Sequence, residues 1–184
     1  MNFDRWYYFL SLERDFIRTL DFVHLSVANE KTYSNEFAKL LLLLGSEVDV
    51  VAKLLCQKID PMKKPKNIDQ YREIITTAYE GMPKIEIGVV RYEMMRQPWA
   101  SWSKTIPESP IWWKAYNDVK HERDKNFLDA NQQNTLDALC GLLSLLLYYL
   151  EDETTKGQLQ PYPELLDHGF PSYLVTEGGR SLPK

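Results

Sequence analysis

The sequence predicts a mainly α-helical protein: a helical bundle of about five helices with a small β-hairpin insertion and an irregular C-terminal tail. Three observations support this fold class. Apolar residues recur every three or four positions over most of the 184-residue chain, they alternate with polar residues around residues 84–94, and glycine and proline gather after residue 156. One domain suits this length. We place it at residues 1–155, with the insertion at 84–110 and the tail at 156–184.

The first two helices are predicted from amphipathic spacing and one capping signal. Residues 3–24 place apolar side chains on one stripe and charged ones, including Glu13, on the other faces. Ser34, three residues before Phe37, is typical of an N-cap and predicts a second helix that continues to about Lys58. Two prolines and three lysines then indicate an exposed basic loop.

Further along the chain, the period of the apolar residues changes twice. Residues 68–79 read as a short helix that ends before Gly81 and Pro83. Ile85, Ile87 and Val89 then alternate with polar neighbours, which predicts one or two short strands and a hairpin that closes near residue 102. Helical spacing returns over residues 112–123 and again over residues 129–150.

The tail combines helix-breaking residues with several large apolar ones. Residues 156–184 contain eight glycines and prolines, which exclude a continuous helix. They also contain Leu159, Leu165, Leu166 and Phe170. Because so much apolar surface is unfavourable in water, we expect this segment to dock on the body of the protein or on a partner.

Composition and motifs exclude several classes of function. The net charge of −4 gives no broad basic surface for nucleic acid or an anionic membrane, so such contacts would need a local patch. The chain has no signal-peptide pattern and no apolar stretch near 20 residues, which predicts a cytoplasmic protein without a membrane anchor. Glycine-rich phosphate loops and metal-ligand spacings are absent, so we expect no cofactor and no metal. Cys56 and Cys140 are expected to be buried free thiols.

Two carboxylates fall on the apolar face of the second helix. Glu47 lies among leucines and valines, and Glu36, eleven residues earlier, falls on nearly the same line. A buried carboxylate without a partner costs several kcal/mol, so Glu47 and Glu36 need cations or hydrogen-bond donors from elsewhere in the chain.

The helix predicted at residues 112–123 offers such donors. Asn117 and His121 are four residues apart and share a face, while Tyr116, Lys120 and Arg123 form the neighbouring stripe. We therefore predict that Glu47 lies within hydrogen-bonding reach of this helix, paired with Lys120 or His121. Two interpretations stay open: a functional site, or a structural network that only fixes helix packing.

The helical core and the run Asn117-Asp118-Val119-Lys120-His121 resemble the HEPN superfamily of nucleotide- and RNA-acting proteins. The signature of that superfamily is Arg, a polar residue, about three variable residues and His. Asn117 and His121 match it, whereas Tyr116 stands where Arg is expected. Lys120 or Arg123 would then have to supply the missing cation. A second formal match, from Arg18 to His24, is attributed to chance.

The resemblance implies metal-independent ribonuclease or RNA-binding activity in a toxin–antitoxin or phage-defence system. It assigns His121 and Asn117 to the 2′-hydroxyl and the scissile phosphate, at a site composed across a homodimer. Such chemistry suits these residue types, because histidine transfers protons near neutral pH and lysine or arginine stabilises charge on phosphate. The partners expected on this interpretation are RNA, a second copy of the chain and an antitoxin or other protein.

Other interpretations compete with this one. In a non-catalytic helical interaction module, the polar residues would form a structural network, and the aromatic insertion with the apolar tail would bind another protein. A metal site built from Glu36, Glu47 and His121 is disfavoured, because the chain lacks a Glu-x-x-His repeat. The tryptophans near residues 99–113 are expected to form a packed corner rather than base-stacking platforms.

Overall fold

The computed structural model describes residues 3–167 and 182. Within them are six α-helices: α1 (Asp4–Thr19), α2 (Asn35–Ile59), α3 (Ile68–Ala78), α4 (Ile111–Asn126), α5 (Gln132–Tyr149) and α6 (Glu151–Thr155). Three short strands accompany them: β1 (Ile87–Val89), β2 (Met94–Arg96) and β3 (Leu166–Asp167). The predicted helical bundle with a hairpin insertion is confirmed, and the structure adds the short α6 and the third strand.

The helix starts follow from local capping. The Ser34 hydroxyl accepts a hydrogen bond from the backbone N–H of Phe37 at 3.0 Å, so the predicted N-cap of α2 is confirmed. Asn67 and Asn131 cap α3 and α5 in the same way. Each cap satisfies a backbone donor that the first turn of a helix leaves without an intrahelical partner.

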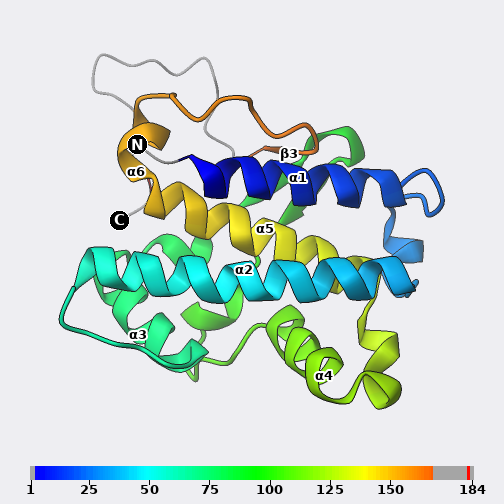
Figure 1. The fold of residues 1–184 in the computed structure, drawn as a ribbon, viewed down its shortest axis with the longest axis horizontal. Coiled ribbons are helices and arrows are strands. Elements are labelled where there is room, and N and C mark those ends of the chain that lie inside the picture. The colour runs from blue at the N-terminus through cyan, green and yellow to red at the C-terminus, as the bar shows by residue number, and fades with distance from the viewer. Residues whose placement is uncertain (1–2, 168–181, 183–184) are drawn as a thin grey trace.

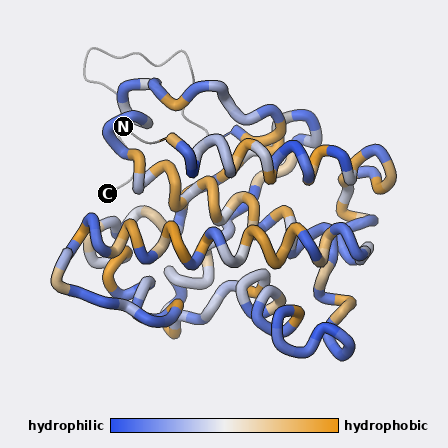
Figure 2. The backbone as a smooth tube through the Cα atoms, in the orientation of Figure 1, coloured by the Kyte–Doolittle hydropathy of each residue, from blue (hydrophilic) through white to orange (hydrophobic). Residues whose placement is uncertain are grey.

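Helix α5 is the centre of the bundle. Its residues from Leu136 to Tyr148 are almost all fully buried, and hydrophobic residues run along most of its length (Figure 2). Helices α1 and α2 pack against it, and α3 and α4 lie on the far side of α2 from α1 (Figure 1). A helix that is apolar on all sides is stable only when other elements cover all of it.

The insertion supplies the hairpin and a cluster of tryptophans. β1 pairs antiparallel with β2, and β3 from the tail pairs antiparallel with the other edge of β1. Trp99 lies 4.2 Å from Trp102 and 5.0 Å from Trp112 between ring centroids, and all three are buried. The predicted packed corner is confirmed, because buried rings are not available to stack on bases.

One glycine allows this corner to reach the central helix. A Cβ at Gly141 of α5 would lie 2.8 Å from a ring carbon of Trp112, so the ring packs directly on the backbone there. The Trp99 indole N–H donates to the carbonyl of Gly141 at 3.2 Å, and the Trp112 indole donates to the carbonyl of Pro98 at 2.8 Å. The insertion is thereby joined to the bundle by both packing and hydrogen bonds.

The described part of the tail lies against the body of the protein. Leu159, Leu165 and Leu166 are buried in the core, and the carbonyl of Pro161 accepts a hydrogen bond from the Trp6 indole at 3.1 Å. Residues 168–181, which include Phe170, lie outside the described residues, so the predicted docking of Phe170 stays a prediction.

The two cysteines and the lengths of the helices can be compared with the sequence-based expectations. Cys56 and Cys140 are both buried and free, as expected, and burial raises the pKa of the Cys56 thiol to about 12. None of the helices in the described ranges has the length and apolar character needed to cross a membrane.

Candidate functional site

A polar cleft lies between α2, the start of α3 and α4, and it contains three of the residues that the sequence singled out. Tyr116, Asn117 and Lys120 of α4 form one wall. The opposite side is built by residues of α2 and by Lys66 to Ile68, and the volume of the cleft is about 420 Å³. The site predicted on residues 112–123 therefore adjoins a real cleft, but the residues opposite it differ from those expected.

Close approach of α4 to α2 creates this cleft. The Tyr116 ring lies directly on Gly45, where a Cβ would overlap the ring atoms Cδ2 and Cγ. Tyr116 is only 5% exposed, and the Lys120 ammonium lies 5.3 Å from its ring centroid. Tyr116 thus has a packing role at the position where the HEPN signature has arginine.

Positive charge dominates the cleft. Lys53 of α2, Lys66 of the α2–α3 connection and Lys120 of α4 line it together with a single carboxylate, that of Asp49. Asp49 accepts a hydrogen bond from the Tyr71 hydroxyl at 2.7 Å and pairs with Lys53. Burial, and then the hydrogen bond to Asp49, raise the pKa of Tyr71, which keeps this hydroxyl protonated as a donor.

The predicted site residues Asn117, His121 and Arg123 of α4 have different surroundings. The Asn117 side-chain amide donates to the carbonyl of Trp113 in its own helix at 2.8 Å. His121, one turn further on, is exposed. At Glu122 the backbone leaves helical geometry (φ −140°, ψ 58°), and Arg123 beyond this kink donates to Asn35 at 2.6 Å. Arg123 therefore lines a separate hollow with Asn35 and does not line the cleft.

The expected partner of Glu47 was wrong. Glu47 is 8% exposed, as its place on the apolar face predicts, but Arg5 of α1 donates to its carboxylate at 2.6 Å. The reason is the orientation of α2, in which Gly45 contacts the Tyr116 ring of α4. Two residues along a helix correspond to a rotation of about 200°, so Glu47 points away from α4. Neither Lys120 nor His121 pairs with the Glu47 carboxylate.

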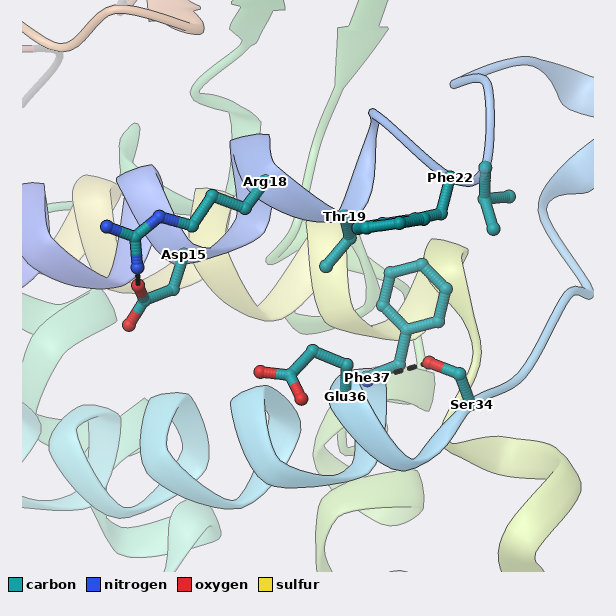
Figure 3. A pocket seen from close by; sticks show the side chains of 8 residues that line it. Asp15, Arg18, Thr19, Phe22, Ser34, Glu36 and Phe37 are labelled. Carbon is teal, nitrogen blue, oxygen red and sulfur yellow. Dashed lines mark hydrogen bonds and ion pairs between the residues drawn. The ribbon is translucent and has the colours of Figure 1, made fainter.

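The expected core position of Glu36 was also wrong. Its side chain is 53% exposed and pairs with Lys39 of the next turn at 2.8 Å. Glu36 lies in the first turn of α2, near the point where α1 has ended, and it borders a pocket instead of the core (Figure 3). Glu36 and Glu47 are eleven residues apart, or about 16 Å along the helix, too far to share a metal ion with His121. Within the described residues, no group of three or more His, Cys, Asp or Glu could hold a metal.

The second formal match to the HEPN signature falls on residues with other contacts. Arg18, near the end of α1, pairs with Asp15 at 2.8 Å. His24 follows α1 in a loop, and its ring lies edge-on to that of Tyr92 at 5.7 Å.

Sequence reasoning missed the most buried carboxylate of α1. Glu13 is 1% exposed and accepts hydrogen bonds from the backbone N–H groups of Glu164, Leu165 and Leu166 at 2.9–3.1 Å. Burial raises the pKa of Glu13, and these three donors oppose part of that rise. The signal was present in the sequence, because Glu13 stands four residues after Phe9 and three before Phe16, on the apolar stripe.

A second missed group joins the hairpin to the central helix. Arg96 of β2 pairs with Glu30 and lies 3.7 Å from Asp137 of α5. The Arg96 Nε is buried without a hydrogen-bond partner among the described residues. Burial outweighs the attraction of Arg96 and raises the pKa of Asp137 from 3.8 to about 6. A charged residue at position 137, inside an apolar helix, was the signal for this network.

We expect this network to make the stability of the protein depend on pH. Because the folded-state pKa of Asp137 exceeds its ordinary value, its contribution to stability is present below about pH 4 and is lost as pH rises through 6. Asp137→Asn cannot ionise. The free energy of unfolding of the variant should therefore rise relative to wild type between pH 4 and 7, by up to about 3 kcal/mol. Urea unfolding at several pH values measures this difference.

A matched control separates this effect from the titration of other groups. Asp124 is an exposed aspartate of α4, and Asp124→Asn makes the same chemical change at the surface. The change in free energy of unfolding between pH 4 and 7 that Asp137→Asn causes, relative to wild type, should exceed the change that Asp124→Asn causes. A constant difference for Asp137→Asn would contradict the assignment.

Comparisons of the chain with protein-family models, curated proteins and solved structures give no match. The resemblance to the HEPN superfamily therefore depends on Asn117, His121 and the helical architecture of the chain itself.

Proposed function

We propose that the protein is a HEPN-like RNA-binding protein of the cytoplasm that binds the RNA backbone in the cleft between α2 and α4. One observation carries this proposal: Lys53, Lys66 and Lys120 come from three separate segments and line one cleft with a single carboxylate, that of Asp49, in a chain with a net charge of −4. Neutralisation of phosphates by lysine is the main source of affinity for nucleic acid. The concentration of positive charge in one cleft supports a local phosphate site.

The same proposal places RNA cleavage at the edge of the cleft. His121 lies one turn beyond Asn117 and is exposed, but it does not line the cleft, so it would act on the strand where the strand leaves the cleft. In this reaction His121 accepts the proton of a 2′-hydroxyl, whose oxygen bonds to the adjacent phosphorus as the P–O5′ bond breaks, and the departing 5′-oxygen takes up a proton from water. Lys120 would stabilise the charge that grows on the phosphate. A second copy of the chain would complete the site, as the resemblance implies, in a toxin–antitoxin or phage-defence role.

Replacing the three lysines tests the binding step. The triple variant Lys53→Gln, Lys66→Gln, Lys120→Gln should bind a fluorescent single-stranded RNA more weakly. The slope of log K against log salt should fall in magnitude by about 2, since each phosphate contact contributes about 0.7 for a single strand. Fluorescence anisotropy at several salt concentrations gives both values. Lys104→Gln, an exposed lysine of the insertion outside the cleft, is the control. Equal salt slopes for the triple variant and wild type would exclude the cleft.

Replacing His121 tests the cleavage step separately. His121→Ala should keep RNA affinity and abolish cleavage, with little change in the free energy of unfolding because the side chain is exposed. Growth of cells that express wild type or His121→Ala extends the test to toxicity, which only wild type should show. Binding without cleavage by wild type, tested as the purified oligomer, would restrict the function to RNA binding.

A non-catalytic interaction module is the second candidate, and one observation favours it. Tyr116 and Asn117 are both used in packing: the ring on Gly45, and the amide on the carbonyl of Trp113. On this interpretation, the polar residues only fix α4 against α2. The two candidates differ in the same experiments, because an interaction module would bind no RNA in a salt-dependent way and would be equally inert with or without His121.

A further inference from the structure

A second pocket lies at the opposite end of the α1–α2 pair from Glu47. It is formed by the last turn of α1, the loop that follows it and the first turn of α2, and its volume is about 420 Å³ (Figure 3). This volume falls in the range of sites for small organic molecules. The pocket shares no residue with the cleft between α2 and α4.

Aromatic rings form the apolar part of this pocket. Phe37 is fully buried beneath it, and Phe22 is 88% exposed beside it. Figure 3 shows the Phe22 ring above that of Phe37, with Thr19 next to them. A large ring left so exposed is unfavourable in water and would gain from contact with an apolar ligand. The exposed Phe22 ring could therefore contact a ligand that carries one aromatic ring.

The neutral polar groups of the pocket already have partners. The Thr19 hydroxyl donates to the carbonyl of Phe16 at 2.6 Å, and the Ser34 hydroxyl accepts from the N–H of Phe37 at 3.0 Å. Ser34 and Glu36 also place two oxygen-bearing side chains at the positive end of α2, where an anion would otherwise be favoured. The remaining capacity to bind a ligand thus belongs to the charged groups.

Each carboxylate among those charged groups has one cationic partner, and Glu36 keeps one oxygen atom without a hydrogen bond among the described residues. Two carboxylates, of Asp15 and Glu36, line the pocket together with one guanidinium, that of Arg18. Arg18 binds one oxygen of Asp15 at 2.8 Å, and Lys39, which does not line the pocket, binds Oε2 of Glu36 at 2.8 Å. Glu36 Oε1 accepts no hydrogen bond from any residue in the described ranges. One carboxylate oxygen is therefore available to a donor inside the pocket.

We propose that this pocket binds small primary amines that carry one aromatic ring. The ring would lie against the exposed ring of Phe22, and the ammonium group would donate to Glu36 and Asp15. A charge-assisted hydrogen bond and a nearby aromatic face are the two interactions that an organic ammonium ion uses best. The site is independent of RNA binding, so its test does not depend on the cleft.

Three probes of matched shape test the proposal: phenethylamine, 2-phenylethanol and 3-phenylpropionate. Saturation-transfer NMR and isothermal titration should show binding of phenethylamine with a Kd of about 1 mM, a value expected for a ligand of this size. Phenylethanol should bind about tenfold more weakly, because it lacks the charge that strengthens the hydrogen bond. Phenylpropionate should not bind.

Variants then locate the site. Glu36→Gln should weaken phenethylamine binding about tenfold, and Phe22→Ala should weaken all aromatic probes by about fivefold. Both side chains are exposed, so the fold should be retained, which circular dichroism checks. Glu108→Gln, an exposed carboxylate of the insertion, is the control and should leave the Kd unchanged. Absence of phenethylamine binding at 5 mM, roughly fivefold above the expected Kd, would overturn the proposal. So would equal binding of phenylpropionate, or an unchanged Kd in Glu36→Gln.

Discussion

Glu13→Ala is expected to lower the free energy of unfolding by about 3 kcal/mol and to release the described part of the tail. The substitution leaves three backbone N–H groups, of Glu164, Leu165 and Leu166, without their acceptor in a buried place. Each unsatisfied buried donor costs about 1–3 kcal/mol, and the chain can lower this cost only by exposing the segment to water. Urea unfolding and limited proteolysis after residue 156 measure the two effects.

Two variants make this prediction specific. Glu13→Gln keeps one acceptor oxygen but brings an N–H₂ group toward the same donors, so it should cause a smaller loss than alanine. Glu164→Gln removes only an exposed ion pair with Arg91 at 3.3 Å and should change stability by about 0.5 kcal/mol or less. If Glu13→Ala were as stable and as protease-resistant as Glu164→Gln, the buried carboxylate would not hold the tail.

Gly45→Ala should be the most damaging substitution of a small residue in α2. An added Cβ would overlap the Tyr116 ring, so either the ring or all of α4 has to move. Overpacking of a core costs about 1–3 kcal/mol, which exceeds the gain of about 1 kcal/mol that alanine brings to a helix interior. We therefore expect a net loss of about 2 kcal/mol in urea unfolding, with weaker RNA binding because the cleft is distorted.

A double-mutant cycle shows whether the ring is the cause. In a Tyr116→Ala background the obstacle is gone, so Gly45→Ala should become neutral or stabilising by about 1 kcal/mol. Gly88→Ala in β1 is the matched control, because a Cβ there meets no atom closer than 3.5 Å. The same loss with and without the Tyr116 side chain would show that Gly45 has another role.

The order of the five longer helices and the start of α2 were predictable because their causes are local, whereas α1 ends at Thr19, five residues before the predicted end. Ser34 caps α2 as its sequence spacing indicated, and the change from a helical to an alternating period placed the hairpin within the insertion. The pairing of β3 with β1 was not predictable. It joins residues about 78 positions apart, and the two-residue strand has too little alternation to be detected.

The candidate site was predicted only in part. Asn117, Lys120 and Tyr116 do line one cleft, as their common place on a helix suggested. Lys53 of α2 and Lys66 of the predicted basic loop complete this cleft. Their convergence depends on how closely α4 approaches α2, and Gly45 sets that distance.

What the sequence determined by itself is the five longer helices and most of the side chains that they bury, including Glu47 but not Glu13 or Glu36, because periodicity fixes which residues share a face. Only the tertiary structure decided which groups contact those faces. Glu47 pairs with Arg5, Glu13 accepts from the backbone of residues 164–166, and Asp137 lies beside Arg96. The physical reason is that a pattern along one helix carries no information on the rotation of that helix relative to its neighbours. That rotation is set by packing among distant segments, and a change of two residues reverses the direction of a side chain.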